Sequence, residues 1–222
     1  MNHVIRILAV CTLLASASVA QQRNDPMEAM NHRASRLIDS SMQRLNLRAE
    51  RFNEELGKIN KARPLDPSML SAEKIKENTG KINDFLAYLD VYRSLSANMR
   101  KQVDDSVAAM RSEMPIRVRK AYLQEFLDAY ASDQTAFDKY TMALTNVYTN
   151  VKQVLEFIST AKVQVVDGKL SFTDKTEYEQ YETLMNKVNA ANRKLVSASA
   201  ASQKATLEAS DQMNKAYGAA NK

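Results

Sequence analysis

The chain of 222 residues contains 31 lysines or arginines, 26 aspartates or glutamates and only 1 cysteine, and its formal net charge is +5. This small positive excess lies far below the charge density of a nucleic-acid-binding protein, so we expect no nucleic-acid partner. With only 4 glycines and 4 prolines, the sequence is poor in the residues that turns require, and a mostly helical protein is predicted.

The first twenty residues have the features of a secretory signal peptide. Arg6 supplies a positive charge, an apolar run extends from Ile7 to Leu14, and the small residues Ser18 and Ala20 precede a cleavage site after Ala20. We therefore expect export to the periplasm or the extracellular space. No later apolar run approaches the length of about 18 residues that a membrane-spanning helix needs, so no transmembrane segment is expected in the mature chain.

Cys11 offers an alternative processing site. The stretch "LAVC" resembles the lipobox of bacterial lipoproteins, in which the cysteine becomes the lipidated first residue. Val10 stands where a small residue is usual, and the apolar run before it is short, so we favour cleavage after Ala20 over lipid anchoring through Cys11. The mature chain then has no cysteine and depends on packing alone in an oxidising compartment.

Residues 21–222 are predicted to form a single helical-bundle domain. Apolar residues recur at helical spacing from Met30 to Ile59, and Pro64 and Pro67 stop the first helix. Pro115 ends or kinks the second helix. The predicted helices cover about residues 26–62, 69–112, 116–162 and 174–217.

The third predicted helix carries the most regular apolar pattern in the chain. Two series of residues with a seven-residue period predict coiled-coil-like packing. The second series contains one acid, Asp133, which is either a buried carboxylate that binds a cation or proton, or a polar residue that sets the register or turns to water. We favour the second interpretation. The series are Ile116, Leu123, Tyr130, Phe137, Leu144, Val151 and Ile158, and Arg119, Phe126, Asp133, Tyr140, Val147, Val154 and Ala161.

A β-hairpin is predicted over residues 163–172, between the third and fourth helices. Two β-rich runs, "VQVV" and "KLSF", flank Asp167 and Gly168, and Asp-Gly favours a two-residue type I′ turn with positive φ at the glycine. Because an isolated hairpin is marginally stable, its apolar side chains must pack on the helix ends. The candidates for this packing are Val163, Val165, Leu170 and Phe172.

These elements together predict an all-α fold, an elongated antiparallel bundle of four long helices with one short β-hairpin. The distal part of the fourth helix has a weaker apolar face, because beyond Val196 its apolar positions are mostly alanine and serine, which bury little area. That segment forms either a close, thin packing seam or a loosely held tail.

The hairpin region also resembles a known group of proteins. The sequence "VVDGKLSFTDKTEYEQYETL" is similar to the tail of an uncharacterised family of bacterial helical envelope lipoproteins, in which an x-G-x-x-F turn precedes a tyrosine-bearing helix. The similarity covers roughly the C-terminal third of the chain. It implies a cell-envelope protein and identifies no functional residues.

The sequence contains no nucleotide-binding or hydrolase motif, so we predict a non-enzymatic protein with no catalytic residues, no cofactor and no metal site. Glu28 and His32 are four residues apart, but two ligands fall short of the three or four that zinc requires. The aromatic residues of the third helix either form core or line a ligand pocket, and we favour core. Of these aromatic residues, Tyr122 and Tyr148 lie off the main apolar seam and are expected to be the most exposed.

One surface feature has a defined geometry. Six cations of the first helix fall within about 60° of a common direction, on the basis of 100° per residue. Guanidinium groups pair well with phosphates, so this arginine ridge is our candidate contact with an anionic surface; the alternative is a solvated flank of the core. The ridge comprises Arg33, Arg36, Arg44, Arg48, Arg51 and Lys58.

We therefore expect an exported structural or interaction protein of the cell envelope, with an envelope protein or an anionic envelope surface as partner. The alternative is a periplasmic carrier or holdase that binds an apolar ligand or an unfolded client between helices. Oligomerisation is left open.

Overall fold

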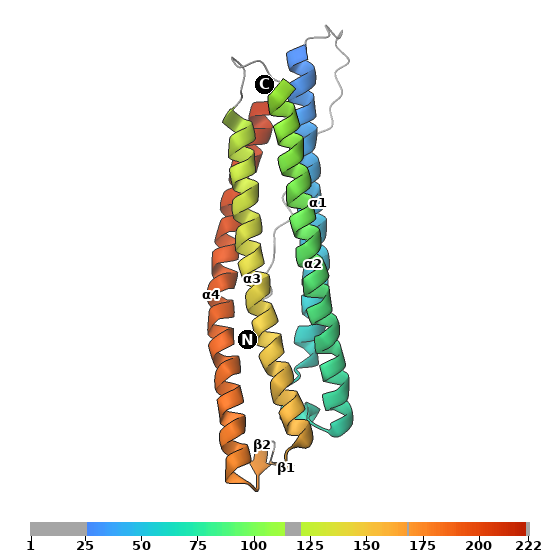
Figure 1. Ribbon diagram of the computed structural model, residues 1–222, viewed down its shortest axis with the longest axis vertical. Helices are drawn as coiled ribbons and strands as arrows, with labels where there is room; N and C mark the ends of the chain where they lie inside the picture. Colours follow the sequence, from blue (N-terminus) through green and yellow to red (C-terminus); the bar gives the residue numbers. More distant parts are fainter. Residues whose placement is uncertain (1–25, 114–120, 168, 221–222) are drawn as a thin grey trace. The chain divides into compact units, whose positions relative to one another are not determined.

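The computed structural model describes residues 26–113, 121–167 and 169–220, and these form four α-helices and one β-hairpin (Figure 1). The helices pack against one another, which confirms the predicted all-α class and the place of the hairpin. The proposed signal peptide, Cys11 and Pro115 lie outside the described residues. The elements are α1 (Pro26–Ala62), α2 (Ala72–Glu113), α3 (Ala121–Thr160), β1 (Val163–Val166), β2 (Lys169–Phe172) and α4 (Lys175–Ala220).

The chain divides into two compact units, and each unit takes segments from all four helices. Among the described residues, the first unit comprises residues 26–54, 99–113, 121–131 and 208–220, and the second comprises residues 55–98, 132–167 and 169–207.

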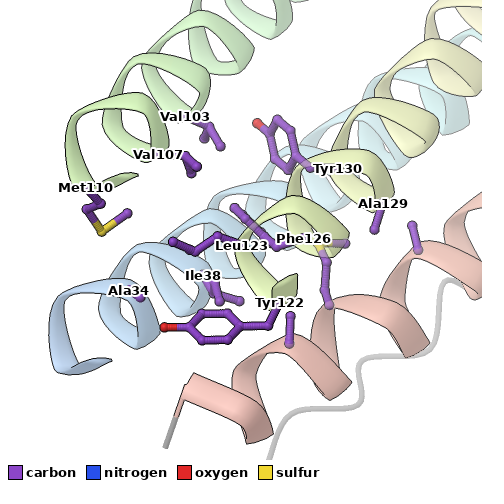
Figure 2. Close-up of a cluster of buried hydrophobic side chains, with 13 residues drawn as sticks. Ala34, Ile38, Val103, Val107, Met110, Tyr122, Leu123, Phe126, Ala129 and Tyr130 are labelled. Carbon is purple, nitrogen blue, oxygen red and sulfur yellow. The ribbon is translucent and has the colours of Figure 1, made fainter. Parts of the chain in front are cut away.

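The core of the first unit is an apolar cluster to which all four helices contribute (Figure 2). Leu123 and Phe126 of α3 are fully buried there. The distal part of α4 contributes mainly small side chains, and Ala209, Met213 and Ala216 are all at most 4% exposed. Of the two alternatives for this segment, a thin packing seam or a loosely held tail, the structure shows the seam. Small side chains let the α4 backbone approach its neighbours. The other members of the cluster are Ala34, Ile38, Val103, Val107, Met110, Tyr122, Ala129 and Tyr130.

The core of the second unit follows the heptad pattern of α3. Leu144, Val151, Val154 and Ile158 are all buried. Rings from two helices meet there, since Phe85 of α2 lies edge-on to a tyrosine of α3 with 5.1 Å between the ring centroids. The two apolar series thus mark the buried face of α3 in this unit.

The connection between α1 and α2 determines where the first helix ends and where the second begins. Arg63 adopts a left-handed conformation with φ 43°, the usual conformation of the residue that ends a helix. α2 begins at Ala72, slightly beyond the expected start near residue 69, because Pro67–Met69 forms a 3₁₀ turn. Asp66 holds this turn, since the Ser68 hydroxyl and backbone N–H donate to its Oδ1 at 2.7 and 3.0 Å. These hydrogen bonds lower the pKa of the Asp66 carboxyl.

The hairpin has the predicted position and pairing. Val163 lies opposite Phe172 in an antiparallel register. Asp167 has φ 50°, as the first central position of a type I′ turn requires; Gly168 lies outside the described residues. Phe172 attaches the hairpin to the helices, with rings of α3 and α4 around it. Val165 was expected among the packing candidates, but it is 49% exposed, although the register places it on the same face of the hairpin as Val163 and Phe172.

Candidate anionic-surface site

The arginine ridge lies on α1, and three of its members face solvent freely. Arg36, Arg44 and Arg51 are exposed. None of these three forms an ion pair with a described residue. All three belong to the first unit, and the rise from Arg36 to Arg51 is about 22 Å along the helix axis. Their charges are therefore available to an external anion.

Two other members of the ridge are engaged with α2. The Arg33 Nη1 lies 2.7 Å from Glu113 Oε2 and forms an ion pair with it. Arg48 is half-buried, and its Nη1 donates to the sulfur of Met99 at 3.3 Å. These two side chains cover the edge of the α1–α2 contact. For them, the second interpretation of the ridge, a flank of the core, therefore applies instead of a contact with an anionic surface.

Lys58, the sixth member, belongs to the second unit. Its Nζ forms an ion pair with Glu55 Oε1 at 2.7 Å, so its charge is neutralised within α1, unlike the charges of the three exposed arginines.

The structure adds one residue that the sequence interpretation missed. Leu47 is 60% exposed, although it is a large apolar side chain. At 100° per residue it falls among the exposed arginines, within about 40° of their mean direction. Its angular distance from the apolar face of the first helix was the available signal. Arg36, Arg44, Leu47 and Arg51 are called the α1 outer face from here on.

Most aromatic residues of α3 are buried, Phe137 is half-buried, and the expectation that Tyr122 and Tyr148 are the most exposed of them is wrong. Both are buried, at 6% and 8% exposure. The Tyr122 hydroxyl donates to Asn31 Oδ1 at 3.4 Å, and the Tyr148 hydroxyl donates to Asn60 Oδ1 at 2.9 Å. These contacts join α3 to α1. A bundle helix packs against more than one neighbour, so its buried face is wider than the main seam.

Asp133 is buried at 8% exposure, so it does not turn to water. Its Oδ1 accepts a hydrogen bond from the Thr206 hydroxyl of α4 at 2.7 Å, and its Oδ2 accepts one from Gln134 at 3.3 Å. A polar contact between two helices in an apolar seam favours one register, because any shift would leave the carboxylate buried without its donor.

The described residues contain no group of three or more potential metal ligands. Glu28 and His32 are both exposed, with 3.8 Å between Oε1 and Nε2. None of the described helices has the length and apolarity of a membrane span.

Comparison with known proteins gives no relative: no family model, curated protein or solved structure matches the chain. The function must therefore be argued from the residues of the chain itself.

Proposed function

We propose that this protein is an exported, non-enzymatic structural or interaction protein of the cell envelope, and that the α1 outer face contacts an anionic lipid surface. The observation that carries the proposal is the combination of three exposed arginines, without an anionic partner among the described residues, and the exposed Leu47 between them. The signal-peptide features and the resemblance of the hairpin region to envelope lipoproteins support the location.

The chemistry of this face fits phospholipid headgroups. Each guanidinium can donate two parallel hydrogen bonds to phosphate oxygens. A leucine among them can enter the boundary between headgroups and acyl chains, where apolar area gains free energy by leaving water. A soluble polyanion could pair with the arginines but would form no apolar contact with Leu47.

The predicted size of the effect follows from the number of charges. Each basic residue near an anionic membrane contributes about 1 kcal/mol. Replacing Arg36, Arg44 and Arg51 together by glutamine should therefore weaken binding to phosphatidylglycerol-containing vesicles about a hundredfold, as measured by co-sedimentation at low salt. Glutamine is a comparable helix former, so the helical circular dichroism should not change.

A matched control removes three charges from the same unit at other positions. Glutamine at Lys101, Arg111 and Lys215 gives the same net charge but leaves the α1 outer face intact, since these residues contact Asp105, Gln124 and Asp211, none of which lies on α1. Equal losses of vesicle binding in both triple variants would contradict the proposal that the α1 outer face is the binding surface.

Leu47→Ser distinguishes a lipid surface from a soluble polyanion as the partner. It should weaken vesicle binding and leave binding to polyphosphate unchanged.

A further inference from the structure

A cavity of about 250 Å³ lies in the second unit, at the corner where α1 ends and α2 begins. Its lining includes Lys58 and Lys61 from α1, and Lys74, Glu77, Asn78 and Lys81 from α2. Four ammonium groups and one carboxylate give this lining an excess of three positive charges. The cavity lies wholly in the second unit, so it is a separate feature from the α1 outer face.

Two of the four lysines are neutralised locally. Lys81 donates to Glu77 and holds the pKa of that carboxyl below its usual value, so Glu77 is ionised. Lys58 pairs with Glu55.

The other two lysines form no direct ion pair with a described carboxylate. Lys74 Nζ donates to the backbone carbonyl of Ser68 at 3.1 Å, and its charge also acts on the Asp66 and Glu77 carboxylates and contributes to lowering their pKa, without a direct ion pair to either. Lys61 is exposed and forms no ion pair with a described side chain. These two ammonium groups supply the attraction for an external anion.

Asn78 provides an independent sign of a missing acceptor. Its side chain lines the cavity but is only 4% exposed, and its Nδ2 has no hydrogen-bond partner among the described residues. A buried amide donor without an acceptor loses its hydrogen bonds to water and gains none in return. An anion in the cavity would supply the acceptor oxygen.

We propose that this cavity binds a small phosphate-bearing anion. Ammonium groups donate to phosphate oxygens from several directions, and a multiply charged phosphate matches the charge excess better than one carboxylate. The volume is about eight times the ~30 Å³ that a water molecule occupies in the liquid, and it lies below the range of roughly 300–1,000 Å³ for drug-sized ligands. Phosphate with a small substituent therefore fits, either as a free molecule or as a lipid headgroup.

Calorimetric titration with pyrophosphate at low salt tests the proposal. Wild-type protein should bind it saturably, and glutamine at Lys61 and Lys74 together should weaken binding at least tenfold. The matched control is glutamine at Lys76 and Lys187, two exposed lysines of the second unit outside the cavity, which should retain affinity within about twofold. No saturable binding, or equal losses in both double variants, would overturn the proposal.

Asn78→Leu gives a second readout. It should weaken pyrophosphate binding several-fold without lowering the thermal midpoint of the free protein, since it removes a donor that has no partner. An unchanged affinity in this variant would contradict the role of Asn78. Competition against pyrophosphate distinguishes the source. Competition by glycerol phosphate but not by phosphatidylglycerol vesicles identifies a free phosphate ester, and competition by both identifies a lipid headgroup.

Discussion

Replacing Phe172 by alanine should detach the β-hairpin from the helices. The Phe172 ring lies 6.4 Å from the Phe157 ring of α3 and 5.0 and 6.0 Å from the Tyr181 and Tyr178 rings of α4, measured between centroids. Truncation of a fully buried phenylalanine costs about 3–5 kcal/mol, and Phe172 is half-buried. We therefore expect a loss of about 2–3 kcal/mol in the free energy of unfolding, including the aromatic pair contributions.

Thermal and urea denaturation followed by circular dichroism measure this loss, which corresponds to a lowering of the melting temperature by about 5–10 °C. Val165→Ala is the matched control, because Val165 belongs to the same hairpin but is 49% exposed; it should change stability by less than about 0.5 kcal/mol. If both variants are as stable as wild type, the hairpin does not stabilise the second unit, and the interpretation of Phe172 as its attachment point is refuted.

Thr206→Val removes the hydroxyl that donates to Asp133 and should lower the free energy of unfolding by about 1–3 kcal/mol. The same substitution in an Asp133→Leu background should cost much less, and a double-mutant cycle in urea measures the difference; additive effects would mean that the two residues are not coupled. Burial raises the pKa of Tyr140 from 10.0 to about 12, so its stabilising contribution is complete below pH 10 and is lost as the pH rises toward 12. By pH 11 this loss is about 1 kcal/mol, and Tyr140→Phe should make the alkaline fall in the urea midpoint shallower; an identical fall would contradict the assignment.

The sequence predicted those elements that local signals determine. Proline and the residue before it stop α1 at Ala62, and Asp-Gly places the turn between β1 and β2. The start of α2 lies slightly later than expected because it depends on the hydrogen bonds that one side chain, Asp66, accepts. Asp66 accepts hydrogen bonds from Ser68, which holds a 3₁₀ turn where helical spacing alone would continue the α-helix.

The buried face of α3 was predicted too narrowly for a different reason. A heptad pattern identifies the side chains directed at the centre of a bundle, but not those directed at a second neighbour. Tyr122 and Tyr148 lie off the main apolar seam, so they were expected to be exposed to solvent. The structure buries their rings and gives each hydroxyl an asparagine of α1. Sequence spacing contains no information on where Asn31 and Asn60 would lie relative to α3.

Sequence spacing also does not show which members of the arginine ridge contact a neighbouring helix. Those contacts determine which substitutions can test the function. Spacing on α1 places Arg44 and Arg48 on neighbouring positions of one surface, but only contact with α2 makes them different. Arg48 donates to Met99 and is half-buried, so its removal would perturb packing as well as charge. Arg44 is exposed and has no such contact. A loss of vesicle binding in a variant that includes Arg48 would therefore be ambiguous, whereas the same loss after substitution of Arg36, Arg44 and Arg51 can be assigned to the surface.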